Sequence, residues 1–108
     1  MGSYPMTYPT AAVLIAIRSG YRYGFDIMDA TGLPDGTVYP ILRRLERRGF
    51  LTASWEEAAI AHRENRPARR YYGLTAEGVA TVQLATGRFP GLERMVATHG
   101  DDLDPRLA

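Results

Sequence analysis

The spacing of apolar residues changes abruptly at Gly49, and this change constrains the fold more than any other feature of the sequence. Before it, Val38, Leu42 and Leu45 follow a helical period, which predicts a helix with one buried face. After it, residues 51–56 alternate between apolar and polar side chains, which predicts a strand. A helix that passes into a strand through one glycine indicates a mixed α+β domain.

Two short helices are predicted ahead of this junction. Residues 10–19 are apolar enough to be buried on most sides, and residues 24–30 form a shorter helical stretch. A breaker cluster at residues 31–34 separates them from the third helix, which we expect to end at Gly49. Asp35 is expected to cap the third helix by accepting main-chain hydrogen bonds, and Pro40 to lie near its first turn.

A second strand is predicted over residues 69–74, with Tyr72 and Leu74 in the core. Together with the first strand it would form a hairpin. The segment between the strands, residues 57–68, is polar and contains a proline, so we expect a loop there. Trp55, the only tryptophan, is expected to pack the hairpin against the body, and a platform for a ligand is the alternative.

The chain is expected to close with a helix from residue 76 that Thr75 caps and that Gly87 and Pro90 interrupt. The helix carries an apolar stripe. A chain of 108 residues buries only a small core, so we expect a second copy to cover this stripe, as in a homodimer. Packing of the stripe within one chain is the alternative. The stripe consists of Val82, Ala85, Phe89, Leu92 and Val96.

Positive charge is concentrated in one segment. All 13 basic residues are arginine, and eight of them fall within residues 43–70 against four acidic residues. The segment therefore has four excess positive charges, although the whole chain has a net charge of only +1. Such a distribution is typical of proteins that bind a phosphate backbone, and an arginine-rich solvated surface is the alternative.

Several classes of function are excluded or disfavoured by composition. There is no cysteine, which removes disulfides, thiol nucleophiles and cysteine-ligated zinc. His62 and His99 are isolated, so we expect surface residues, no metal and no cofactor. We find no nucleophile paired with a base, so an enzyme is not expected. The longest apolar run, residues 11–17, is too short to span a bilayer, and we expect a cytoplasmic protein.

The predicted order of helix, helix, turn, helix, hairpin and helix is that of a winged helix-turn-helix, which is α+β and mainly helical. A helix about 10–12 Å wide fits a major groove about 12 Å across, and a hairpin tip can reach the adjacent backbone. The residues expected to contact DNA are Gly36, Thr37, Tyr39, Pro40, Arg43, Arg44 and Arg47 on the third helix and Arg63 and Arg66 on the tip. A winged helix that binds protein instead of DNA is the alternative function.

Three segments resemble motifs of the PadR family of transcriptional regulators. Residues 23–27 are similar to the family's YGYEI stretch, residues 36–49 to its GTLYPxLxRLExxG recognition segment, and residues 69–78 to RRYYxLTxxG. The resemblance implies a homodimeric repressor that a small effector commonly relieves, and Tyr39 looks like the motif tyrosine that contacts DNA. Short members hold flat apolar ligands between their C-terminal helices, for which Phe89 is the candidate here.

The resemblance also suggests how the chain is divided. It looks like the short subgroup of the family, which has a single C-terminal helix. We expect residues 1–75 to form the winged helix-turn-helix and residues 76–108 to form a dimerisation helix and tail within the same compact unit. The interruption by Gly87 and Pro90 departs from the family's pattern for that helix. The sequence predicts a palindromic operator because a two-fold dimer presents two equivalent recognition helices.

Overall fold

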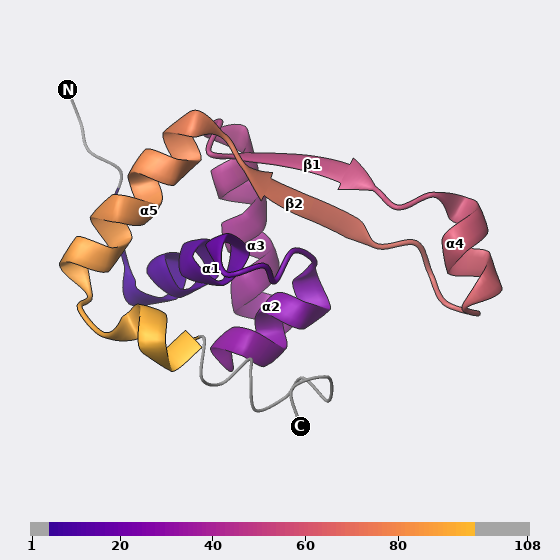
Figure 1. The fold of residues 1–108 in the computed structure, drawn as a ribbon, viewed down its shortest axis with the longest axis horizontal. Helices are drawn as coiled ribbons and strands as arrows, with labels where there is room; N and C mark the ends of the chain where they lie inside the picture. Colours follow the sequence, from indigo (N-terminus) through magenta and orange to yellow (C-terminus); the bar gives the residue numbers. More distant parts are fainter. Residues whose placement is uncertain (1–4, 97–108) are drawn as a thin grey trace.

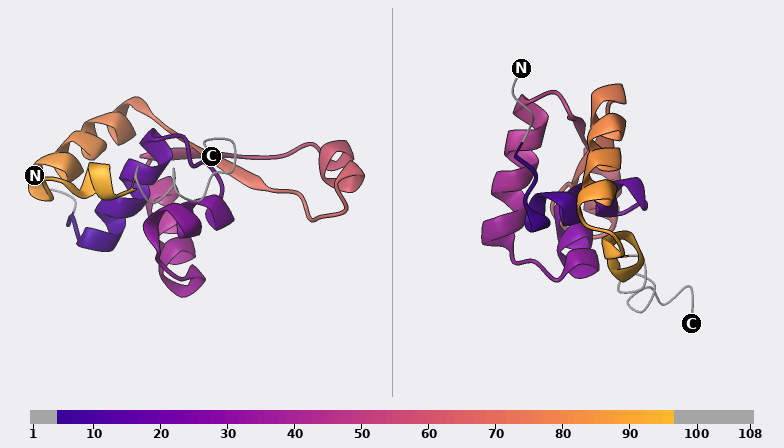
Figure 2. Two further views of the ribbon diagram at one scale, coloured as in Figure 1. Left: turned by 60° about the horizontal axis from the view of Figure 1, so that its bottom comes forward. Right: turned by 90° about the vertical axis from the view of Figure 1, so that its left-hand side faces the viewer.

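The computed structural model describes residues 5–96, and Figure 1 shows how the elements are arranged. Two strands and a short helix extend to one side of a body made of the other helices, as Figure 1 and the left view of Figure 2 show. The order confirms the predicted α+β, mainly helical fold with a two-stranded wing. The elements are α1 (Tyr8–Arg18), α2 (Gly24–Thr31), α3 (Asp35–Arg47), β1 (Leu51–Trp55), α4 (Ala58–Arg63), β2 (Arg70–Leu74) and α5 (Ala76–Arg88).

Helix α1 is the centre of the body. Every residue from 10 to 17 is buried, and the helix packs against α2, α3 and α5. Thr7 caps it, because its hydroxyl oxygen accepts a hydrogen bond from the Thr10 amide at 3.3 Å. A helix with apolar residues on nearly all sides is stable only where other elements surround it. The prediction that this segment is buried on most sides is thereby confirmed.

Helices α2 and α3 form the helix-turn-helix. Helix α2 ends at Thr31, the next residue, Gly32, adopts the left-handed conformation, and α3 begins at Asp35. The prediction that Asp35 caps α3 is wrong. Pro34 occupies the cap position, and the Asp35 carboxylate accepts only from the adjacent Gly36 amide, at 2.7 Å. Pro40 lies inside the helix and beyond its first turn, so the helix lacks one main-chain donor there.

The predicted core face of α3 is confirmed. Val38, Leu42 and Leu45 are fully buried, and Ile41 joins them at 4% exposure. After α3 the chain reverses at Gly49, whose φ of +81° is a conformation that favours glycine. This turn delivers the chain directly into β1, as the change in apolar spacing predicts.

Strands β1 and β2 pair antiparallel from Leu51 opposite Leu74 to Trp55 opposite Arg70. We call residues 51–74 the wing and residues 57–68 its tip. The prediction of a loop throughout the tip is wrong, because residues 58–63 form α4. This helix is six residues long, and its one buried residue is Ala61. A helix of this length with a single buried side chain has no recognisable spacing of apolar residues, so the sequence pattern does not predict it.

Helix α5 returns to the body and packs against α1. Thr75 caps it as predicted, accepting from the Gly78 amide at 3.0 Å. The predicted break is also present, since the helix ends at Arg88, Gly91 has a φ of +89°, and residues 92–96 are helical again. His99 and the acidic tail lie outside the described residues.

The apolar stripe of α5 does not face outward, which corrects the prediction of a dimer seam there. Val82, Ala85, Leu92 and Val96 are at most 3% exposed within the single chain and belong to its own core. Phe89 is half-buried and packs edge-on against Tyr8, with ring centroids 5.6 Å apart. The alternative of packing within one chain is therefore correct for this stripe.

No helix among residues 5–96 is both long enough and apolar enough to cross a membrane.

Candidate nucleic-acid interface

The outer face of α3 carries the polar residues opposite the core face. Gly36 is exposed and Thr37 half-buried, so the start of the helix presents little side-chain bulk. Arg43, Arg44 and Arg47 are exposed, and no ion pair joins them to any residue within 5–96. This face combines small residues at one end with three long cationic side chains at the other.

Tyr39 bridges the two helices of the helix-turn-helix. Its ring lies across Gly24 so closely that a Cβ atom built on Gly24 would be 2.3 Å from the tyrosine hydroxyl oxygen. The side chain nevertheless remains 39% exposed. Tyr39 is therefore both a packing residue and a surface residue, and the glycine of the first motif supplies the space for its ring. Two motifs that are separate in sequence thus meet at one contact.

The wing is fastened to α3 by an ion pair from Arg70, at the end of the ladder nearest the tip. Arg70 on β2 donates to the Glu46 carboxylate on α3 at 3.1 Å. The same guanidinium lies 5.2 Å from the centre of the Trp55 ring. This contact braces the hairpin against α3 and so helps to set where its tip lies relative to the outer face of α3.

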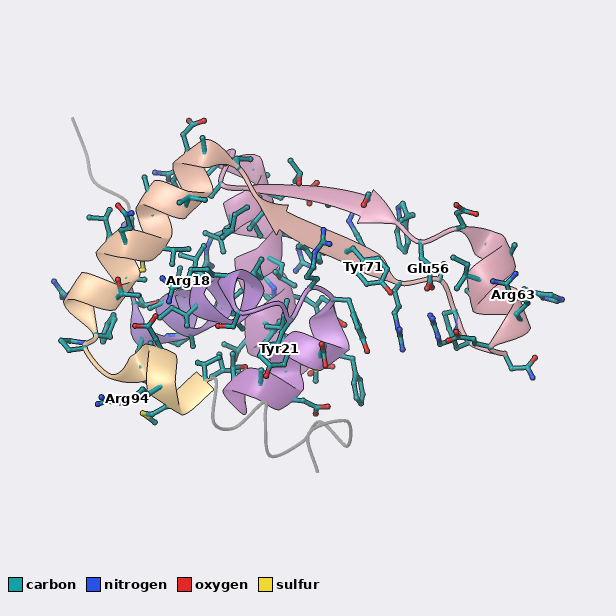
Figure 3. The ribbon with its side chains drawn as sticks, viewed as in Figure 1. Arg18, Tyr21, Glu56, Arg63, Tyr71 and Arg94 are labelled. Atoms are coloured by element: carbon teal, nitrogen blue, oxygen red, sulfur yellow. The ribbon has the colours of Figure 1, made fainter. Side chains whose placement is uncertain are left out.

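The two tip arginines predicted to contact DNA differ in their exposure and in their ion pairs. Arg63 is exposed at the end of α4, and Figure 3 shows it at the far end of the wing. Arg66 is only 20% exposed at its side chain and forms ion pairs with Glu56 at 2.7 Å and Glu64 at 2.9 Å. Its charge is satisfied within the wing, so Arg63 is the better candidate for contacting a partner.

An open cleft of about 770 Å³ lies between α2, the start of α3 and the wing. Arg69 stands with its guanidinium carbon 4.1 Å from the centre of the Tyr23 ring, which in turn packs edge-on against Tyr71. Burial raises the pKa of Tyr23, so its phenol is neutral at physiological pH. The cleft thus combines aromatic rings with cationic side chains, and Asp26 and Asp29 also line it. The aromatic residues that line it are Tyr23, Phe25, Tyr39, Trp55 and Tyr72.

The prediction that Trp55 packs against the body is wrong, and sequence reasoning did not find the cleft. Trp55 is 64% exposed and is a lining residue instead. Phe25, also 64% exposed, lines the cleft as well. The available signal was local: residues 23–25 and 69–72 are rich in aromatic and arginine side chains, and the hairpin brings both segments to one cleft.

The helix-turn-helix with its wing defines the class of winged helix-turn-helix DNA-binding proteins. A match to the sequence profile of the transcriptional regulator PadR-like family covers residues 13–84. The chain belongs to the PadR-like family of transcriptional regulators, which is not a family of enzymes. The resemblance found in the three sequence motifs is confirmed. None of the curated proteins matches the chain.

Solved structures agree with this assignment. A PadR-like transcription factor from Bacteroides fragilis superposes with a TM-score of 0.62 at 23% identity, covering 82% of this chain and 86% of that one. The protein smu.1704 from Streptococcus mutans UA159 gives 0.60 at 28% identity, covering 82% and 83%. A PadR family regulator from Eggerthella lenta DSM 2243 gives 0.58 at 20% identity, covering 91% and 86%.

Proposed function

We propose that this regulator is a cytoplasmic repressor that binds a palindromic operator as a homodimer. The observation that carries the proposal is the sorting of charge on α3: Arg43, Arg44 and Arg47 are exposed and have no ion pair within the described residues, whereas the opposite face is core. Three cations held on the outer side of one helix match the phosphates and guanine edges of a major groove. Gly36, Thr37, Tyr39 and Pro40 lie towards the start of the same helix and would approach the bases.

Two arginine variants test how the interface is divided. Arg43→Ala should weaken binding to the cognate site by about 1–3 kcal/mol, and binding to random DNA less, if Arg43 reads a base pair. Arg63→Ala should weaken both equally and reduce the log–log salt slope by roughly 2 per dimer, as expected for two phosphate contacts. Arg88→Ala, an exposed arginine at the end of α5, is the matched control and should change neither.

In vitro selection of bound sequences followed by fluorescence anisotropy measures both quantities. Selected sites without inverted symmetry would contradict the palindrome. Equal loss of cognate and random binding in Arg43→Ala would show that Arg43 does not read sequence. Failure of the wild type to shift any DNA at low salt would favour the alternative of a winged helix that binds protein.

The proposed dimer needs a surface other than the buried stripe. Val79 and Leu84 on α5 are 47% and 58% exposed, and Met95 is 61% exposed. These apolar side chains lie outside the face of α5 that packs on α1, so we propose them as the contact between subunits. Light scattering at micromolar concentration tests the dimer, and a stable wild-type monomer would contradict it. In the proposed dimer, the two α3 helices would lie about 34 Å apart, which is one turn of DNA.

We further propose that an effector, a small planar or aromatic hydrophobe, binds in the aromatic cleft. Phe89, the residue expected from sequence, already packs against Tyr8, whereas the cleft offers five aromatic rings. Trp55 lies in it and is the only tryptophan, so its fluorescence reports binding directly. Phe25→Ala should weaken quenching by a panel of planar hydrophobes and Phe89→Leu should not. Weaker quenching in Phe89→Leu but not in Phe25→Ala would instead place the effector site at Phe89.

A further inference from the structure

The two arms of the wing tip are joined at Glu56, by its main-chain amide, which donates to the Arg69 carbonyl at 2.7 Å, and by its carboxylate. The ladder ends where Trp55 pairs with Arg70, and Glu56 is the next residue along the chain. The Glu56 carboxylate accepts hydrogen bonds from the Arg66 guanidinium at 2.7 and 2.9 Å and from the Arg69 main-chain amide at 3.2 Å. Figure 3 shows Glu56 at the neck of the wing, with Arg63 beyond it at the far end. The outgoing and returning arms of the tip are therefore linked at this residue.

The chemistry of this contact makes it a strong one. The Glu56 side chain is only 6% exposed, and a carboxylate so placed requires partners for its oxygens. Arg66 supplies a bidentate pair, the geometry in which arginine and carboxylate interact most strongly. Hydrogen bonding from Arg66 lowers the pKa of Glu56 to about 2, so the carboxylate is ionised throughout the physiological range.

We propose that Glu56 is a positioning residue for DNA binding: through Arg66 it holds the tip so that Arg63 meets the phosphate backbone. This inference rests on the proposed DNA-binding function. It also assigns Arg66 a role inside the wing rather than on the DNA. The proposal runs against simple electrostatics, because Glu56 is a negative charge close to a polyanion. Removing a negative charge alone would strengthen binding, whereas loss of positioning weakens it, so the two explanations predict opposite signs.

The experiment compares Glu56→Gln with Glu57→Gln by anisotropy on a duplex selected by the wild type. Glu57 is the adjacent residue, is exposed, and its side chain has no ion pair with the rest of the described chain. Both variants remove one negative charge per subunit at nearly the same place. We expect Glu57→Gln to bind as tightly as wild type or more tightly. Glu56→Gln should bind roughly tenfold more weakly at about 0.1 M salt, with a smaller salt slope, as for the loss of two phosphate contacts.

A charge-conserving variant separates positioning from charge and from direct contact. Arg66→Lys keeps the positive charge but cannot form the bidentate pair. If Arg66 contacted phosphate itself, lysine would largely replace it, and binding would change little. We expect Arg66→Lys to weaken binding about as much as Glu56→Gln. This variant also keeps the proposal testable if Glu56→Gln unfolds near the assay temperature.

A double-mutant cycle shows whether the effect passes through Arg63. Arg63→Ala should weaken binding in the wild type and have little further effect in the Glu56→Gln background. Additive losses, or tighter binding by Glu56→Gln, would overturn the positioning role while leaving DNA binding intact. Absence of DNA binding by the wild type would instead overturn the proposed function and this inference with it.

Discussion

Gly78 is the glycine at which the addition of a single methyl group should destabilise the folded state most. A Cβ atom built there would lie 2.0 Å from the carbonyl oxygen of Phe50 and 3.1 Å from its carbon. Real Cβ atoms do not approach this closely, and the obstacle is main chain, so a side-chain rotation cannot relieve it. The same oxygen accepts a hydrogen bond from the Thr75 amide at 3.1 Å, which anchors the start of α5 to the turn before β1.

Gly78→Ala should therefore separate α5 from this turn. Overpacking of a core contact costs about 1–3 kcal/mol, and the loss of the Thr75 hydrogen bond adds about 1 kcal/mol. The expected loss in free energy of unfolding is roughly 2–4 kcal/mol. At about 4–8 °C per kcal/mol for a domain near this size, the melting temperature should fall by roughly 8–32 °C.

Gly87→Ala is the matched control, since it makes the same substitution near the end of the same helix. A Cβ atom there would meet no atom within 4 Å. Alanine favours a helix over glycine by up to about 1 kcal/mol, so this variant should be as stable as wild type or slightly more stable. Thermal unfolding followed by circular dichroism measures both. Equal melting temperatures for the two variants would refute the close approach at Gly78.

Four variants probe other contacts. Gly24→Ala should displace the Tyr39 ring and weaken DNA binding, measured by anisotropy, and unchanged affinity would argue that the ring's position is irrelevant to binding. Leu92→Asp should unfold the chain because Leu92 is buried in its own core, whereas Leu84→Asp should keep the fold and yield monomers in light scattering. Glu56 has its pKa lowered from 4.5 to about 2, so it stabilises the folded state above about pH 4.5 and loses this contribution as the pH falls toward 2. Urea unfolding should therefore show the difference between wild type and Glu56→Gln shrinking over that interval, and a constant difference would contradict the ion pair.

Features with a local cause could be predicted from the sequence. The core face of α3 and the strand after Gly49 follow from apolar periods of 3.6 and 2, which depend only on the geometry of each element. The cap at Thr75 and the break after Arg88 follow from residue chemistry within one turn. Asp35 shows the limit, since Pro34 takes the cap position one residue earlier.

Contacts between segments that are distant in the sequence could not be predicted. The spacing of Val82 and Ala85 shows that one face of α5 is buried, but the same spacing fits a partner subunit or the chain's own α1. The pair of Glu56 and Arg66 spans ten residues, with α4 between them, a separation that neither helical nor strand periodicity connects. Such contacts are decided by the path of the chain, which the sequence pattern does not specify.

The arginine-rich segment shows why composition alone overestimates a DNA-binding surface. The fold places carboxylates and aromatic rings beside some of its guanidinium groups. Arg66 is paired with Glu56, Arg70 is paired with Glu46, and Arg69 stacks on Tyr23. Within the described residues, the exposed arginines of the segment that form no ion pair include Arg43, Arg44, Arg47 and Arg63. A paired guanidinium must give up its carboxylate before it can neutralise a phosphate, so it adds little to counterion release. The salt dependence of binding should therefore reflect the exposed set rather than all eight arginines. The paired ones would affect it only indirectly, by holding the wing and its tip in place.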